Sequence, residues 1–240
     1  MAQLFAGTSG WAYPSWKPDF YPQKLAQKKF LAHYTTKLNT VEVNFTFRQL
    51  VKETTIQNWL AESPAHFRFG VKAHQVITHI KRLKGTEDFV PRFLATIEPL
   101  AAAGKLGPVL FQLPPNLKAD PALLKDFLAT LPRTVPAAFE FRHESWFSDA
   151  TWDLLRSANS ALCVAETETR TTPDVVTGSF AYYRFRKPTY TGEERRAMVD
   201  RMQEHIAEER NVFAYFKHEE TPEGALYAAE LLRDVSGAAS

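Results

Sequence analysis

Residues 137–166 read AAFEFRHESWFSDATWDLLRSANSALCVAE and contain one complete strand–helix–strand unit. The unit begins with an apolar and aromatic run at 137–142 and ends with a second apolar run at 161–166, and both are typical of buried strands. The segment between them carries Trp152 and Leu155 three residues apart, which places both on one face of a helix. Two short strands joined by a helix indicate a parallel sheet, because parallel neighbours need a crossover connection.

The same alternation of short strands and longer helical segments extends along the whole chain. Eight such units in 240 residues predict an α/β fold of the (β/α)8 TIM-barrel type with parallel strands, since these barrels typically have about 250 residues. An open, doubly wound sheet is the alternative architecture. The predicted strands are Leu4–Thr8, Thr40–Phe45, Phe67–Ala73, Pro108–Leu113, Ala137–Arg142, Ala161–Glu166, Phe180–Phe185 and Val212–Lys217.

Several helices have recognisable start signals, and one connection has none. Thr191 and Glu194 have the spacing of a capping box, and Asp120-Pro121 places a capping side chain before a proline. By contrast, residues 167–178 between the sixth and seventh strands are polar, contain Pro173 and show no helical face. The sequence therefore predicts that the sixth helix is irregular or missing.

Composition and length exclude several classes of protein. With 45% hydrophobic and 23% charged residues the chain is neither disordered nor of low complexity. We expect one barrel domain over residues 1–235 and a flexible tail at 236–240. No apolar run approaches the ~20 residues that a membrane helix needs, and Met1–Gly10 lacks the layout of a secretory signal. A single cysteine, Cys163, excludes an internal disulfide and fits a cytoplasmic protein.

Polar residues alternate with apolar ones in several predicted strands, although parallel strands buried on both faces are usually apolar throughout. Side chains alternate between the two faces of a strand, so the polar set is expected to point into the barrel. That set consists of Glu42, Asn44, Gly70, Lys72, His74, Gln112, Glu140, Arg142, Tyr182, Arg184 and Arg186. The opposite set is expected to pack against the helices and consists of Val41, Val43, Phe45, Phe69, Val71, Ala73, Phe139, Phe141, Tyr183 and Phe185.

The inward polar residues gather toward the carboxyl ends of their strands, where barrel enzymes place their chemistry. One interpretation is a self-contained network in which Glu42 and Glu140 neutralise Lys72, Arg142 and Arg184. Buried ion pairs alone add little stability because desolvation opposes the attraction. A ligand therefore explains such a network better.

Cations outnumber carboxylates in this set, which indicates an anionic, phosphorylated ligand. We expect Arg184 and Arg142 to clamp it, and Glu140 or Glu42 to act as general acid or base if the protein is a hydrolase or lyase acting on a phosphate-containing substrate. The candidate catalytic residues are Glu42, Lys72 and Glu140. The candidate substrate-binding residues are Trp11, Asn44, His79, Gln112, Arg142, Trp146, Arg184 and Arg186, with Gln112 and Asn44 orienting the ligand and the tryptophans walling the cavity.

Three other functions compete with this hypothesis. A non-catalytic nucleic-acid binder would grip phosphates with the basic rim, although the net charge of +2 does not by itself indicate one. Paired carboxylates also occur in glycoside hydrolases, but the excess of cations would keep their pKa values low. A metal-dependent hydrolase or nuclease would need convergent ligands, for which His74, His79, His143 and His218 are the candidates. None has a diagnostic spacing, so the sequence assigns no metal site and identifies no cofactor.

Five sequence blocks follow one another along most of the chain. They are Gly7-Thr8-Ser9-Gly10-Trp11 with Phe20-Tyr21-Pro22, Val41-Glu42-Val43-Asn44 with Thr46-Phe47, Phe69-Gly70-Val71-Lys72-Ala73 with Ile77-Thr78-His79, Leu106-Gly107-Pro108 with Gln112-Leu113-Pro114-Pro115, and Phe139-Glu140-Phe141-Arg142 with Ser145-Trp146-Phe147. Together these blocks resemble the YecE-like family, also called domain of unknown function 72. The resemblance implies a (β/α)8-type barrel and supplies no established activity.

This chain departs from the family pattern mainly in its C-terminal third. It keeps Arg184 but has Arg186-Lys187 where the family usually shows His and Gly, and Arg48 stands where Tyr is usual. Residues 216–219 read Phe-Lys-His-Glu in place of Phe-Asn-Asn-Asp. If the usual His and Asp of the family serve a metal or a proton transfer, this chain either lacks that step or uses His218 and Glu219 for it. The shift toward Arg and Lys, Lys217 included, favours an anionic ligand for this chain.

Overall fold

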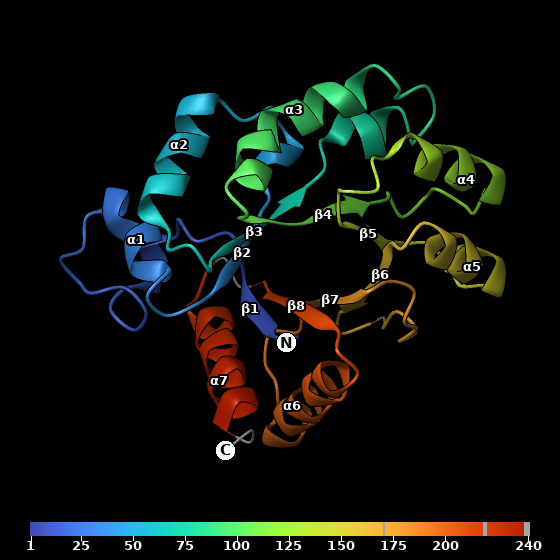
Figure 1. The fold of residues 1–240 in the computed structure, drawn as a ribbon. Coiled ribbons are helices and arrows are strands. Elements are labelled where there is room, and N and C mark those ends of the chain that lie inside the picture. The colour runs from blue at the N-terminus through green and yellow to red at the C-terminus, as the bar shows by residue number, and fades with distance from the viewer. Residues whose placement is uncertain (170, 218–219, 238–240) are drawn as a thin grey trace.

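The chain forms a closed barrel of eight parallel strands, as the sequence predicts (Figure 1). The computed structural model describes residues 1–169, 171–217 and 220–237. Each strand pairs with the next one in chain order, and β8 closes the barrel by pairing with β1. The strands are β1 Leu4–Ser9, β2 Thr40–Val43, β3 Arg68–Lys72, β4 Leu106–Gln112, β5 Ala137–Glu140, β6 Ala161–Glu166, β7 Phe180–Phe185 and β8 Asn211–Phe216.

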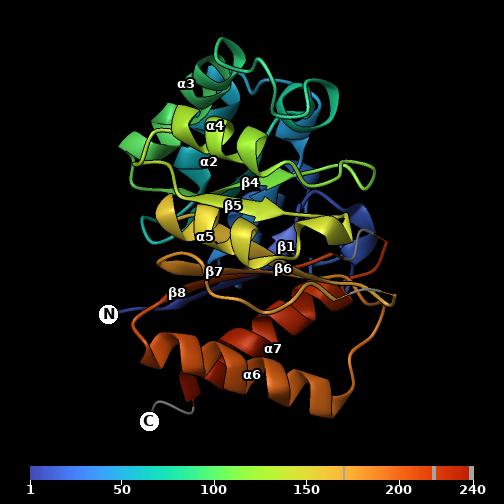
Figure 2. The same ribbon diagram turned by 90° about the vertical axis from the view of Figure 1, so that its right-hand side faces the viewer.

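The helices surround the barrel, and in the side view the N-terminus and the end of α7 lie on the side where the strands begin (Figure 2). They are α1 Phe30–Tyr34, α2 Glu53–Glu62, α3 Phe89–Ala102, α4 Pro121–Thr130, α5 Asp149–Ser157, α6 Gly192–Ala207 and α7 Glu223–Gly237. Two predicted start signals are confirmed: Thr191 and Glu194 form a capping box on α6, and Asp120 accepts from the Leu123 amide at the start of α4. Since α7 includes Ser236-Gly237, the helix runs into the segment expected to be a tail, and residues 238–240 lie outside the described residues.

Alternation of side chains along the strands separates two apolar clusters. The larger one packs between strands and helices, and the smaller one fills the barrel interior with Phe5, Leu110, Ala138, Ala161, Cys163, Ala165, Phe180, Tyr182, Phe213 and Tyr215. Tyr215 crosses the interior to Thr40, with 2.9 Å between the two hydroxyl oxygens. Gly70 leaves room for it, because a Cβ at that position would lie 2.5 Å from the Tyr215 hydroxyl.

One expectation about the outward face is wrong. Phe45 does not pack under a helix: 48% of it is exposed. The reason is that β2 ends at Val43, two residues earlier than predicted, and the chain then enters a 3-10 turn at Phe45–Phe47. The period-two alternation therefore does not extend to this side chain.

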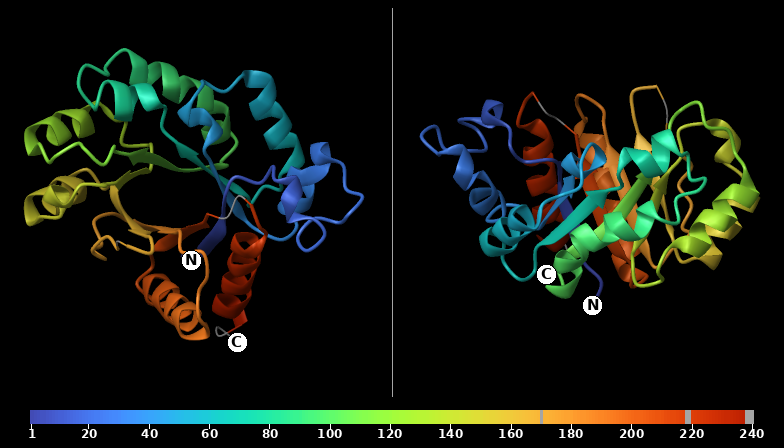
Figure 3. Two further views of the ribbon diagram at one scale, coloured as in Figure 1. Left: turned by 180° about the vertical axis from the view of Figure 1, so that it is seen from behind. Right: turned by 90° about the horizontal axis from the view of Figure 1, so that it is seen from above.

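The sixth connection has no helix in its described residues, 167–169 and 171–179, which confirms the sequence prediction (Figure 3). Side-chain hydrogen bonds hold the connection instead. Thr177 Oγ1 donates to the Ser160 carbonyl at 2.8 Å and accepts from the Leu162 amide at 2.8 Å. Further along, Asp174 accepts from the Tyr183 hydroxyl of β7 at 3.1 Å.

His205 of α6, in its neutral form, extends the hydrogen bonds that hold the sixth connection. A guanidinium only donates hydrogen bonds, so Arg210 Nε donates to His205 Nδ1 at 3.2 Å. The ring proton is therefore assigned to Nε2, which lies 2.6 Å from the Tyr183 hydroxyl oxygen. Burial, together with the charges of Arg210 and Arg201, lowers the pKa of His205 from 6.5 to about 4.

We expect the substitution His205→Gln to make the fold less sensitive to acid. The unfolded chain binds a proton at His205 near pH 6.5 and the folded chain only near pH 4. The stability that the neutral ring contributes is thus complete above pH 6.5 and is lost as the pH falls toward 4. Urea unfolding should show that wild type loses about 1 kcal/mol more than the variant between neutral pH and about pH 5. An equal loss in both proteins would contradict this role.

Candidate functional site

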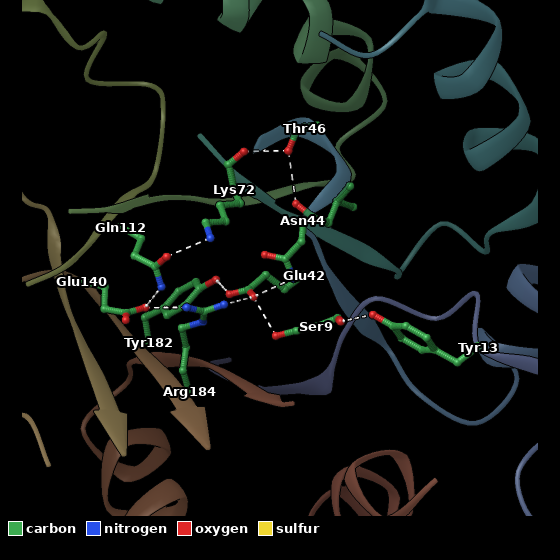
Figure 4. A network of polar contacts seen from close by, with 11 residues as sticks. Ser9, Tyr13, Glu42, Asn44, Thr46, Lys72, Gln112, Glu140, Tyr182 and Arg184 are labelled. Atoms are coloured by element: carbon green, nitrogen blue, oxygen red, sulfur yellow. Dashed lines mark hydrogen bonds and ion pairs between the residues drawn. The ribbon is translucent and has the colours of Figure 1, made fainter. Parts of the chain in front are cut away.

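Polar side chains from different strands meet at the carboxyl-end mouth of the barrel (Figure 4). Most of them stand at or next to the last residue of a strand, which brings them to one level. Pairing register aligns Ser9 of β1 with Glu42 of β2, and Gln112 of β4 with Glu140 of β5. Arg184 enters from β7, which is two strands from β5 and two strands from β1 around the ring. The side chains that the sequence places on the inward face are thus brought together here.

Arg184 bridges two buried carboxylates at the centre of the site. One of its terminal nitrogens lies 2.5 Å from Glu140 Oε2 and the other 2.6 Å from Glu42 Oε1. The side chain of Arg184 is 2% exposed, that of Glu42 is 0% and that of Glu140 is 3%. Both ends of the guanidinium are therefore committed within the protein. This is a correction to the expectation that Arg184 clamps a ligand directly.

Neutral donors complete the coordination of both carboxylates. Ser9 Oγ donates to Glu42 Oε1 at 2.7 Å, and the Tyr182 hydroxyl donates to Glu42 Oε2 at 2.6 Å. Gln112 Nε2 donates to Glu140 Oε2 at 2.9 Å. A buried ion pair is stable only when such hydrogen bonds satisfy its remaining lone pairs.

These contacts keep both carboxyl groups ionised. Burial acts to raise the pKa of Glu42, but the charges of Arg184 and Arg186 and two hydrogen bonds outweigh it and lower that pKa. The same balance lowers the pKa of Glu140 to about 2. A general acid must hold a proton near the working pH. The geometry therefore gives Glu42 and Glu140 the role of partners to Arg184 and supports neither as a general acid.

A cavity of about 390 Å³ opens above this network. The described residues that line it are Asn44, Phe47, Arg48, Lys72, Gln112, Glu140, Arg142, Thr167, Arg184, Arg186 and Lys217. Six of these side chains are cationic and one is a carboxylate. Because Arg184 takes up the carboxylate, the walls of the cavity are strongly positive.

Arg186 is a buried cation of the cavity with an unsatisfied hydrogen-bond donor among the described residues. Its Nε is buried and has no hydrogen-bond partner there, and the same is true of Arg184 Nε. Burial and the neighbouring Arg184 charge lower the pKa of Arg186. Buried donors without a partner are rare in folded proteins, and a bound ion or water is one explanation for them.

Lys72 has a neutral partner in place of a carboxylate. Its Nζ donates to Gln112 Oε1 at 2.8 Å and lies 4.2 Å from the centre of the Phe47 ring. Burial and the Arg184 charge lower the pKa of Lys72 to about 8, against the opposing effect of Glu42 and Glu140. The amine is thus partly uncharged near neutral pH.

The tryptophans lie elsewhere, which corrects the expectation that they wall the cavity. Trp146 is fully buried, stacks on Phe141 and donates from its indole nitrogen to the Leu117 carbonyl at 2.8 Å. Trp11 packs edge-on against Trp59, with 5.7 Å between ring centres. Neither is among the described residues that line the cavity.

Asn44 and His79 take different positions relative to the cavity. Asn44 lines it and contacts Glu42, with 3.4 Å between Nδ2 and Oε1. His79 is not among the described lining residues: its ring lies against the edge of Phe47, 4.9 Å between centres, and Nδ1 lies 2.9 Å from Thr78 Oγ1. His79 can therefore support the Phe47 wall but does not face the cavity.

Six residues of the site were not among the candidate catalytic or binding residues. The cavity is also lined by Phe47, Arg48, Thr167 and Lys217, and Glu42 accepts from Ser9 and Tyr182. For Tyr182 a signal existed, because it lies two residues before Arg184 on the same strand face. For Phe47 and Thr167 there was none, since both lie in turns that follow strands.

The three described histidines that were considered as metal ligands, His74, His79 and His143, do not converge. His74 Nδ1 accepts from the Val76 amide at 3.2 Å, and His143 Nδ1 accepts from the Ser145 amide at 3.2 Å. Within residues 1–169, 171–217 and 220–237, no group of three or more His, Cys, Asp or Glu side chains is placed to hold a metal ion. His218 and Glu219 lie outside the described residues. The same ranges contain no helix long and apolar enough to span a bilayer.

Sequence comparison identifies relatives of this chain. The sequence model of the family described as "Protein of unknown function DUF72" matches residues 5–239. The UPF0759 protein YunF of Bacillus subtilis is 30% identical over 151 residues, which are 60% of this chain and 52% of that protein. The UPF0759 protein YecE of Escherichia coli K12 is 30% identical over 147 residues, 60% of this chain and 50% of that protein. The chain thus spans about half the length of these curated relatives.

Two crystal structures show the same architecture. A DUF72 family protein of Thermotoga maritima superposes with a TM-score of 0.84 at 24% identity, covering 98% of this chain and 99% of that one. A DUF72 family protein of Enterococcus faecalis gives a TM-score of 0.76 at 16% identity, with 99% and 98% covered. At these identities the likeness shows the fold alone.

We expect Arg184→Met to destabilise the barrel strongly, because it leaves two buried carboxylates without their cation. The free energy of unfolding should fall by about 3–5 kcal/mol at neutral pH. In wild type both carboxyl pKa values lie below the ordinary 4.5, whereas burial without Arg184 raises them. The deficit of the variant should therefore shrink as the pH falls toward 4.5.

The matched control is Arg156→Met, which breaks the pair Arg156–Asp153 whose side chains are 48% and 73% exposed. An exposed pair contributes about 0–1 kcal/mol. Chemical unfolding at several pH values measures both variants. Equal losses in the two variants, or a deficit of Arg184→Met that does not depend on pH, would contradict the central role of Arg184.

Proposed function

This chain belongs to the DUF72 family of proteins of unknown function, and we propose that it binds a small anionic ligand bearing a phosphate group at the carboxyl-end mouth of its barrel. The observation that carries this proposal is the charge of the cavity. Its described lining residues include six cations and one carboxylate, and that carboxylate forms an ion pair with Arg184. Positive charge at this density in a partly enclosed cavity favours an anion.

The position of the cations fits a phosphate group. Arg186 follows β7 and Lys217 follows β8, the two strands near which barrel proteins often bind phosphate. The guanidinium fork of Arg186 matches two phosphate oxygens, and its buried Nε lacks a partner among the described residues. A phosphate oxygen would supply that partner. The volume of about 390 Å³ suits a small molecule.

Arg142 and Arg186 replace Arg184 as the ligand clamp in this proposal. Arg184 forms the floor of the cavity, where its pairing with Glu42 and Glu140 fixes the positions of the residues above it. Gln112 orients Lys72 toward the cavity through the hydrogen bond to its amine. We assign no hydrolytic step to the two glutamates, because both are ionised partners of Arg184.

Binding of inorganic phosphate, measured by isothermal titration calorimetry at low salt, tests the clamp. We expect Arg186→Met and Arg142→Met each to weaken binding about tenfold or more, because each removes a charge-assisted hydrogen bond. The control is Arg133→Met, a surface arginine in the loop before β5, at the other end of the barrel. A similar loss in the control, or no loss in the two cavity variants, would overturn the proposal.

A competition experiment distinguishes a small anionic ligand from a nucleic-acid ligand. A short single-stranded oligonucleotide gripped by several cations would bind with an affinity that falls steeply with salt. If such an oligonucleotide binds and phosphate does not displace it, the small-ligand proposal fails. If phosphate displaces it completely, the cavity is the shared site.

The pH dependence of sulfate binding gives an independent test. Sulfate keeps its charge between pH 6 and 10, whereas Lys72 loses its proton as the pH rises through about 8. We therefore expect sulfate affinity to fall through that range in wild type and to stay level in Lys72→Arg, whose charge persists. Calorimetry at a series of pH values measures this. A fall of the same size in the variant would assign the effect to another group.

A further inference from the structure

Lys72 is a cation of the cavity whose amine nitrogen is held by a neutral side chain. A hydrogen bond joins Nζ to the amide oxygen of Gln112 at 2.8 Å, and Nζ lies 4.2 Å from the centre of the Phe47 ring. The carboxylates nearest to it are engaged by Arg184. No carboxylate of the described residues forms an ion pair with Lys72. The amine is therefore placed by one neutral group and directed at the cavity.

A buried structural lysine of the same chain is held differently. Lys105 is 8% exposed, and its Nζ donates to the Leu60 carbonyl at 3.0 Å, to the Ser63 carbonyl at 2.6 Å and to Ser63 Oγ at 2.9 Å. Three acceptors match the three donors of an ammonium group. Lys72 does not have three such acceptors among the described residues, so its surroundings are not those of a site built for a permanent ammonium ion.

The surroundings of Lys72 favour the uncharged amine, which is the nucleophilic form. Partial burial and the neighbouring Arg184 lower its pKa to about 8. A lysine beside another cation in a partly desolvated site is a recurring arrangement for amine nucleophiles that attack carbonyl groups. Arg142 and Arg186 line the same cavity and can hold the anionic end of a substrate.

We propose that Lys72 forms an imine with an aldehyde or ketone that also carries a phosphate group. The inference rests on the proposed function and names the class of its ligand. Lys72 first loses a proton to solvent, and its nitrogen lone pair then bonds to the carbonyl carbon while the carbonyl π electrons move to oxygen, which takes up a proton. The nitrogen then gives up one of its two protons, a proton adds to the hydroxyl oxygen, and water leaves as the nitrogen lone pair forms the carbon–nitrogen double bond. The products are a protonated imine and one water molecule, and no oxidant or reductant is needed.

Trapping with an anionic aldehyde tests this step directly. The probe is pyridoxal 5′-phosphate, with sodium borohydride added to reduce the imine to a stable secondary amine, and peptide mass spectrometry locates the adduct. We expect Lys72 to be labelled about tenfold or more faster than the exposed Lys125 in the same chain, because its amine is more often uncharged and the probe is held beside it. Inorganic phosphate should slow labelling at Lys72 and leave Lys125 unaffected.

Variants separate the chemistry from the binding of the anion. Lys72→Arg keeps the charge and should lose the fast adduct while still binding phosphate in calorimetry, whereas Lys125→Arg should leave labelling at Lys72 unchanged. Pyridoxal, which lacks the phosphate, should label Lys72 more slowly than pyridoxal 5′-phosphate does, and inorganic phosphate should not slow that labelling. Labelling of Lys72 at the rate of Lys125, without protection by phosphate, would overturn the imine proposal. If phosphate nevertheless binds through Arg142 and Arg186, the proposed function stands and only the imine fails; if phosphate does not bind, both fail.

Discussion

The pairing of one arginine with two glutamates at the centre of the barrel is the constraint on which the site depends. Arg184 lies between Glu42 and Glu140 with all three side chains almost fully buried. Each charge would be costly to bury alone, so the three must be placed together, and strand register places them. Ser9 and Tyr182 then donate hydrogen bonds to the carboxylate oxygens of Glu42. The network fixes the floor of the cavity and leaves its walls to other residues.

The same pairing decides what the cavity can do. By pairing with both carboxylates, Arg184 keeps them ionised and so removes them as acid catalysts, while Glu42 and Glu140 still act at longer range on Lys72 and Arg186. Lys72 is left with a neutral amide partner and a lowered pKa, and Arg186 with a buried nitrogen that has no partner among the described residues. An anion held by Arg186 and a carbonyl group facing Lys72 are two parts of one ligand that would complete these contacts.

Sequence periodicity predicted the barrel, the missing sixth helix and the inward face of Glu42, Glu140 and Arg184, because a strand alternates its side chains strictly. It offered the pairing of both glutamates with Arg184 only within a wider network that included Lys72 and Arg142, since the alternation gives a face and not the reach of a long side chain. Periodicity also failed to predict the direction of side chains beyond the ends of the strands. Trp146 lies in a 3-10 turn that directs it behind Phe141, away from the cavity. Where the backbone leaves the strand, only tertiary packing decides the direction of a side chain.

The most direct test of the account is the anomalous diffraction of crystals soaked with tungstate, a heavy analogue of phosphate. The account expects a peak in the cavity within hydrogen-bonding distance of Arg186 and Arg142, with the Arg184 guanidinium still paired to Glu42 and Glu140. A crystal that binds tungstate only on outer surfaces, or in which Arg184 turns away from the glutamates to hold the anion itself, would contradict it.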